Sequence, residues 1–291
     1  MRKFFSLILV FLIIISLSGC ISKETLSPSK SETPTSTTQP TISESSTSTS
    51  PETTTTEAMM PTLNKEDLIN AIESVEKYQF TAEYSTIPKS DTRINSKGGF
   101  DFTKEEAFWE ITSLSGDLVA YSNEVVWGNS IYYSVTVEQD NKIVQQESTS
   151  MTIETYFERV LQGRTEIKTV EEFKQWLFKG ADPTRNPLYY IRDLLSNADS
   201  FEVSKEGSNY IVTFAFTKEE MVNLDSIEKH IKTEGTGKLW LEDNLPIKGE
   251  IKIKRTTSYT GLDSTTTTEA IVKFEISYRY ERPEWVKKIV E

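Results

Sequence analysis

The sequence predicts an α+β fold, in which an antiparallel β meander of about 9–11 strands is combined with helices. The main observation is that apolar residues alternate with polar ones in many short runs, which is the period of half-buried strands. Gly, Asn and Asp turn signals separate these runs at intervals of about 8–12 residues. Helical spacing of apolar residues interrupts them between residues 151 and 195.

Residues 1–19 predict a signal peptide rather than part of the fold. A positively charged start is followed by an apolar run from Phe4 to Leu17. This run is short for a spanning helix, which needs about 20 apolar residues. The segment Leu17-Ser18-Gly19-Cys20 resembles the lipobox of prokaryotic lipoproteins. The resemblance implies cleavage before Cys20 and a lipid on its sulfur, whereas the alternative is an uncleaved anchor over Phe4 to Ile21.

Residues 20–58 predict a lipidated Cys20 followed by a disordered tether. From Ser22 to Ala58 the chain is mostly Ser and Thr with scattered Pro and Glu, and it has no aromatic residue. Such a stretch cannot bury enough apolar surface to offset the entropy of ordering. Similar stalks are typical O-glycosylation targets. We therefore expect a lipid anchor in the cell membrane, a spacer, and an extracytoplasmic domain over residues 59–291.

The domain opens with a predicted helix, after which the apolar period changes to two. Asn64 can cap this helix, and its apolar stripe consists of Leu68, Ile69, Ile72 and Val75. Alternation then predicts strands around Phe80 to Tyr84, Ala107 to Ile111 and Ile131 to Val137. The predicted turns are Gly98-Gly99, Ser115-Gly116-Asp117, Gly128-Asn129 and Asp140-Asn141.

The second half combines helices with longer strands. The predicted helices are Met151 to Leu161, Val170 to Lys179, Pro187 to Leu195 and a charged one over Lys218 to Lys229. The predicted strands are Phe201 to Lys205, Tyr210 to Phe216, Lys238 to Glu242, Lys248 to Tyr259 and Thr266 to Tyr280. The segment Gly235-Thr236-Gly237-Lys238 lacks the first Gly and the final Ser or Thr of a phosphate-binding loop, so we interpret it as a turn.

The composition excludes several functional classes. Cys20 and His230 are the single Cys and the single His, so the chain cannot build an intramolecular disulfide or a Cys- or His-rich metal site. The net charge of −12 disfavours nucleic acid as a partner. His230 is interpreted as exposed at a helix end, and acidic pairs as solvated surface: Glu105-Glu106, Glu171-Glu172 and Glu219-Glu220. We therefore expect no cofactor, no metal and no enzymatic activity.

The order of these elements resembles the LolA/LppX-like superfamily over roughly residues 64–283. The matching segments are Tyr78-Gln79-Phe80, Gly98-Gly99-Phe100-Asp101-Phe102, Trp127-Gly128-Asn129-Ser130-Ile131-Tyr132-Tyr133, Gly237-Lys238-Leu239-Trp240-Leu241-Glu242 and Leu245-Pro246-Ile247-Lys248-Gly249. Members of that superfamily are periplasmic or lipid-anchored carriers of lipids and lipoproteins. The resemblance implies a curved, unclosed antiparallel β half-barrel with helices packed on its concave face. It also implies a hydrophobic cavity between sheet and helices, and it marks no catalytic residue.

Inward alternation selects the side chains that would line such a cavity. They are Phe80, Tyr84, Trp109, Ile111, Tyr133, Phe214, Leu239, Ile253 and Phe274. The same pattern suits ordinary core residues, because bulky side chains can fill a small barrel. Two functions therefore stay open: binding or carrying a lipid or other apolar ligand, and recognition of an envelope protein by a surface module with a filled core.

Overall fold

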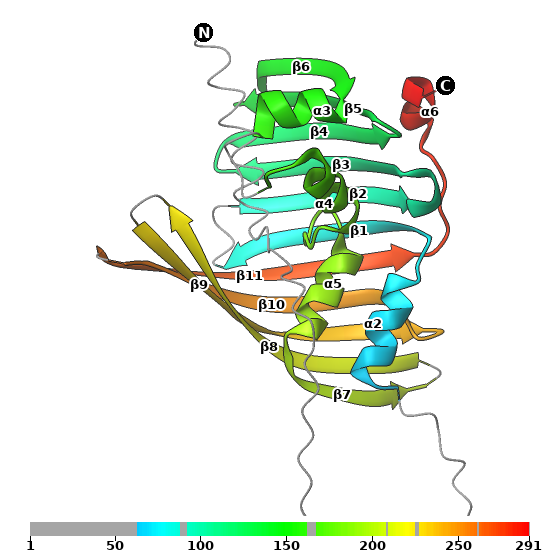
Figure 1. Cartoon of the computed structure of the whole chain (residues 1–291), viewed down its shortest axis with the longest axis vertical. Coiled ribbons are helices and arrows are strands. Elements are labelled where there is room, and N and C mark those ends of the chain that lie inside the picture. The colour runs from blue at the N-terminus through cyan, green and yellow to red at the C-terminus, as the bar shows by residue number, and fades with distance from the viewer. Residues whose placement is uncertain are drawn as a thin grey trace, which may run out of the picture. The chain divides into compact units, whose positions relative to one another are not determined.

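An 11-stranded antiparallel sheet is the frame of the domain (Figure 1). The computed structural model describes residues 63–87, 92–161, 167–207, 209–224, 227–260 and 262–290. The strands are β1 Lys77–Ile87, β2 Thr92–Asp101, β3 Glu106–Ser115, β4 Leu118–Trp127, β5 Ser130–Gln139, β6 Lys142–Thr152, β7 Ala198–Glu206, β8 Asn209–Leu224, β9 Ile227–Glu242, β10 Leu245–Tyr259 and β11 Leu262–Ser277. Their order along the sheet is β6-β5-β4-β3-β2-β1-β11-β10-β9-β8-β7.

This order leaves the sheet open. Strands β1 and β11, far apart in the sequence, pair in its middle, while β6 and β7 lie at opposite edges. The predicted fold class, an antiparallel half-barrel with helices on one face, is confirmed. Every described neighbouring pair along the sheet is antiparallel, so short hairpins suffice for most connections.

The helices are short, and four of the five begin at a residue whose side chain caps them. They are α2 Lys65–Glu73, α3 Ile153–Tyr156, which continues into a π-helical turn at Phe157–Leu161, α4 Val170–Lys179, α5 Pro187–Ser196 and α6 Glu284–Val290. Asn64 caps α2 and Thr169 caps α4, each in a reciprocal capping box. Helices α2, α3, α4 and α5 lie across one face of the sheet, which we call the inner face (Figure 1).

The two faces of the sheet bury different side chains. The core lies on the inner face, where Tyr78, Phe100 and Trp109 are buried beneath the helices. Tyr78 stacks on Phe100 with ring centroids 5.0 Å apart, and Trp109 meets Phe100 edge-on at 5.5 Å. On the opposite, outer face Phe108 packs with Val286 of α6. The C-terminal helix was not predicted, and it covers part of the outer face.

The predicted helix over Lys218 to Lys229 is wrong, because this segment forms the end of β8 and the start of β9. The hairpin places Glu219 opposite Lys232 and Met221 opposite His230. Ladder hydrogen bonds and cross-strand pairs outweigh the helix propensity of this Lys- and Glu-rich stretch. His230 therefore lies on a strand, and its side chain is exposed as predicted. The first helix of the middle block begins at Ile153 rather than Met151, which belongs to β6.

Two predicted turns are strand interiors. Gly98-Gly99 lies within β2 and Gly235-Thr236-Gly237-Lys238 within β9. Gly98 faces Phe80 across the β1–β2 pair, and a Cβ at Gly98 would lie 2.6 Å from the Phe80 ring. Phe214 packs over Gly237 in the same way. These glycines make room for aromatic rings that lie over the strand, which is a packing role and not a turn.

The membrane-targeting predictions cannot be placed on this fold. The signal peptide 1–19, Cys20 and the tether to residue 58 lie outside the described residues. The described residues, from Leu63 onward, belong to one compact unit. Within them, no helix combines the length and apolarity needed to cross a bilayer.

Candidate functional site

A buried loop between α4 and α5 occupies the inner face of the half-barrel. Asp182, Thr184, Arg185 and Asn186 are each less than 10 % exposed. Oδ1 of Asp182 accepts hydrogen bonds from the backbone N–H groups of Thr184 at 2.7 Å and Arg185 at 2.9 Å. Asn186 caps α5, and its Oδ1 accepts the Tyr78 hydroxyl at 2.5 Å. These side chains replace the water that a surface loop would use, which allows the loop to be buried.

An ion pair fixes this loop to the sheet. The Arg185 guanidinium donates to both carboxylate oxygens of Glu124 on β4, with both distances 2.7 Å, and each side chain is 10 % exposed. The guanidinium lies 5.5 Å from the Trp109 ring, whose Nε1 donates to the Arg185 carbonyl at 2.7 Å. Burial opposes the charge of Arg185, but the Glu124 carboxylate outweighs burial and raises the guanidinium pKa above its ordinary value.

Most of the predicted cavity-lining residues are packed into the core. Those in one continuous cluster with the helices are Phe80, Trp109, Ile111, Tyr133, Phe214, Leu239 and Phe274. Burial, together with the nearby Glu147 carboxylate, raises the pKa of the Tyr133 hydroxyl to about 12, so this group stays protonated at neutral pH. Tyr84 and Ile253 differ from the rest, because they are partly exposed and line a cavity on the inner face.

This inner cavity has a volume of about 200 Å³. It lies on the inner face between α5, the loop at residues 181–183 and strands β1 and β8–β11. Its apolar wall consists of Tyr84, Ala181, Pro183, Tyr190, Leu194, Ile253 and Ala270. Its polar wall consists of Thr86, Asp193, Lys218, Thr233, Arg255 and Thr268. The cavity therefore presents apolar surface and charge side by side.

The sequence patterns did not identify two cationic side chains of the inner cavity, Lys218 and Arg255. Lys218 was placed in a helix that does not exist. Arg255 follows Ile251 and Ile253 at the period of an inward-facing strand, which is a signal that could have been used. Lys218 Nζ lies 2.8 Å from Asp193 Oδ2 and 3.2 Å from Glu220 Oε1. Arg255 Nε is buried and has no hydrogen-bond partner.

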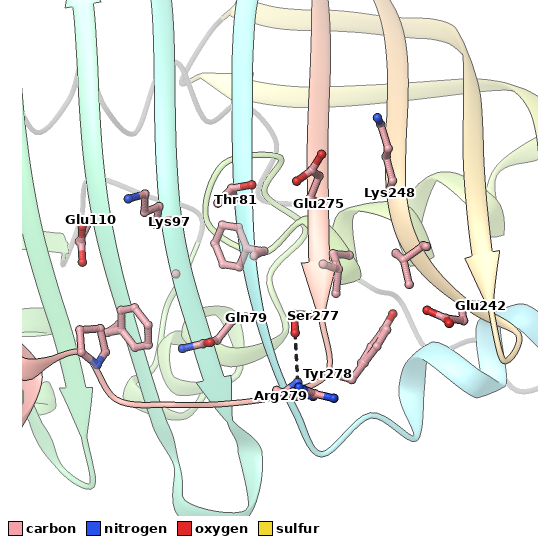
Figure 2. Close-up of a pocket in the computed structure, with 16 residues that line it drawn as sticks. Gln79, Thr81, Lys97, Glu110, Glu242, Lys248, Glu275, Ser277, Tyr278 and Arg279 are labelled. Atoms are coloured by element: carbon pink, nitrogen blue, oxygen red, sulfur yellow. Dashed lines mark hydrogen bonds between the residues drawn. The ribbon is translucent and has the colours of Figure 1, made fainter.

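A second hollow, the outer groove, crosses the opposite face of the sheet. It has a volume of about 840 Å³. Figure 2 shows one row of side chains running across β3, β2, β1, β11 and β10, which are Glu110, Lys97, Thr81, Glu275 and Lys248. The backbone N–H of Arg279 donates to Ser277 Oγ at 3.4 Å beside this row. The groove carries both signs of charge, so it has no preference for a strongly charged partner.

The chain after β11 forms one wall of the outer groove. Arg282 donates to Glu106 Oε1 at 2.7 Å and Oε2 at 3.0 Å, and the Tyr280 hydroxyl donates to Oε1 at 2.6 Å. Glu106 is 0 % exposed, so the prediction that it belongs to a solvated acidic pair is wrong. Burial and the Glu106 carboxylate raise the pKa of Tyr280 above its ordinary value. Glu106 therefore holds the C-terminal segment and is not free for acid–base chemistry.

No group of His, Cys, Asp and Glu side chains suited to a metal ion occurs within the part of the chain that the structure describes.

The sequence matches no protein-family model and no curated protein. Among solved structures, a β-barrel-like protein of the domain of unknown function DUF1849 from Brucella abortus is 11 % identical over 70 % of this chain and 98 % of its own, with a TM-score of 0.26.

Two further solved structures are similar at a lower level. A candidate AttH protein from Nitrosomonas europaea is 10 % identical over 71 % of this chain and 52 % of its own, with a TM-score of 0.13. MucB, in a complex with MucA(peri), is 7 % identical over 74 % of this chain and 94 % of its own, with a TM-score of 0.11. These superpositions are too poor to carry any argument about function. The class of protein is defined by its own fold, an open antiparallel half-barrel with helices on its inner face.

Proposed function

We propose that this chain is an extracytoplasmic, non-enzymatic protein that is anchored to the cell membrane by a lipid on Cys20 and binds an apolar ligand in the inner cavity. The observation that carries ligand binding is the apolar wall of that cavity, to which Tyr84 and Ile253 contribute. The LolA/LppX-like resemblance supports the same reading. The buried charges of the inner face, Arg185 and Glu124, bind each other, which is a structural use rather than a catalytic one.

The volume of the inner cavity limits the ligand. Pockets for drug-sized molecules have volumes of about 300–1,000 Å³. The inner cavity, at about 200 Å³, corresponds to the share of about seven water molecules in the liquid. The ligand that fits is therefore the end of one alkyl chain rather than a whole lipid.

A single-chain neutral probe tests this site. We expect decanol to bind the purified domain saturably at one site, and Ile253→Trp to abolish binding because the larger ring fills the cavity. Ile271→Trp is the matched control, since Ile271 is the same residue type on β11 but faces outward, and this variant should bind like the wild type. Isothermal calorimetry measures both, with circular dichroism to confirm that each variant folds.

The opposite result points to the alternative function, recognition of an envelope protein. Binding that survives Ile253→Trp, or no saturable binding to the wild type, contradicts a ligand site in the inner cavity. The outer groove would then be the surface to examine. It lies on the other face of the sheet, so the Ile253→Trp substitution leaves it unchanged.

Lipid anchoring is tested separately at Cys20. We expect mass spectrometry of the mature protein to show an N-terminal Cys20 that carries a thioether-linked diacylglyceryl group, because two chains give stable anchoring. Cys20→Ser should move the protein from the membrane fraction, or leave it as an unprocessed precursor. A mature protein with an intact Met1, or with a lipid-free Cys20, contradicts this part of the proposal.

A further inference from the structure

We propose that the inner cavity selects anionic amphiphiles, with Arg255 binding the acidic head group while the apolar wall holds the alkyl chain. This inference rests on the proposed function and deepens it, since it names the class of ligand. The ligands of this class share an anionic head group with oxygen atoms at one end of an alkyl chain. A free fatty acid and an alkyl phosphate both provide it.

The position of Arg255 directs its side chain to the inner face. In the antiparallel register it lies opposite Thr268 on β11 and Thr233 on β9, and all three line the inner cavity. Its charge also acts on Tyr84 across the cavity: burial raises the pKa of the Tyr84 hydroxyl, and Arg255 partly opposes that rise. The guanidinium and the apolar wall therefore face the same space.

The Arg255 guanidinium has no anionic partner among the described side chains. Its Nε is buried without a hydrogen-bond partner, and no ion pair joins it to another of the described side chains. A buried donor without a partner costs free energy that folding has to offset. A carboxylate or phosphate can satisfy a guanidinium with charge-assisted, bidentate hydrogen bonds. An anionic head group is thus the partner that Arg255 lacks.

The surrounding acids are already engaged elsewhere. Asp193 and Glu220 both bind Lys218, so the cavity's carboxylate is held by a different cation. Glu234, one residue from Thr233 on β9, alternates to the outer face and binds Lys232 and Lys254 there. Arg255 is therefore left as the positive charge for which the cavity walls supply no counterion.

Isothermal calorimetry with single-chain probes at pH 8 tests the selection directly. We expect decanoate and decyl phosphate to bind the wild type about tenfold or more tightly than decanol, and decyltrimethylammonium to bind most weakly. Arg255→Met should remove the preference for the anions while decanol binding stays within about twofold. Lys252→Met is the matched control on the outer side of the same strand, and it should keep the full preference. Relative binding of decanoate and decyl phosphate then separates the two sources of head group.

A second measurement separates a binding role from a structural one. Because Arg255 Nε has no partner in the protein, Arg255→Met should unfold at the same urea concentration as the wild type or a higher one. Decanol and decanoate that bind equally would overturn the inference but leave the proposed function standing. Absence of binding by all four probes would overturn both. An anion preference that survives in Arg255→Met would also overturn the role of Arg255.

Discussion

Replacement of Arg185 by Met is expected to lower the free energy of unfolding by about 3–5 kcal/mol, which is the effect of leaving a buried charge without its partner. Glu124 would then keep only the Ser122 hydroxyl, which donates to it at 2.9 Å, in a site where its side chain is 10 % exposed. Urea denaturation followed by circular dichroism measures the change. This loss is a large share of the 5–15 kcal/mol that stabilises a typical domain.

A double variant shows whether lost charge pairing or lost packing causes the destabilisation of Arg185→Met. Glu124→Gln combined with Arg185→Met removes both charges, so we expect it to be more stable than Arg185→Met alone. Arg185→Lys should remain destabilised, because an ammonium cannot donate to both Glu124 oxygens in the fork geometry observed here. A loss below about 1 kcal/mol in Arg185→Met would contradict the view that this pair fixes the loop to the sheet.

Replacement of Arg282 by Ala is expected to cost about 3 kcal/mol and to release the C-terminal segment from the outer face. Glu106 would keep the Tyr280 hydroxyl but lose its counterion, while its side chain remains fully buried. Trp285 donates to Glu110 at 2.7 Å and packs edge-on against Phe108, so its release should shift the fluorescence to longer wavelength. Denaturation and Trp emission together measure this result.

The matched control for this experiment is Arg279→Ala. Arg279 lies in the same segment and carries the same charge, but its side chain is exposed, so its removal should change stability by no more than about 0.5 kcal/mol. Equal effects of the two substitutions would show that the charge of the segment matters and not the Glu106 contact. An unchanged emission spectrum in Arg282→Ala would contradict the proposed release.

Much of the fold could be predicted because its signals are local. The period of two along β1, β3, β5 and β11, and the caps of α2 and α4, follow from neighbouring residues in the chain. The wrong predictions fall where the local sequence favours a different structure from the one that the tertiary contacts impose. Gly98 and Gly237 have the composition of turns, yet they lie in strands because aromatic rings of adjacent strands pack over them. The Lys218–Lys229 segment favours a helix alone, yet it pairs as a hairpin.

The candidate site was predicted only in part, because inward alternation identifies buried faces and cannot tell a packed core from a cavity. The anchoring by Cys20 and the LolA/LppX-like relationship remain predictions from sequence. The sequence by itself determined the antiparallel strands and the helices between them, since hydrophobic periodicity acts over a few residues. Only the tertiary structure decided that a buried loop with Arg185 fills the inner face, and that Tyr84, Ile253 and Arg255 share the remaining space. Those contacts join residues that lie up to about 170 positions apart, and no local pattern encodes them.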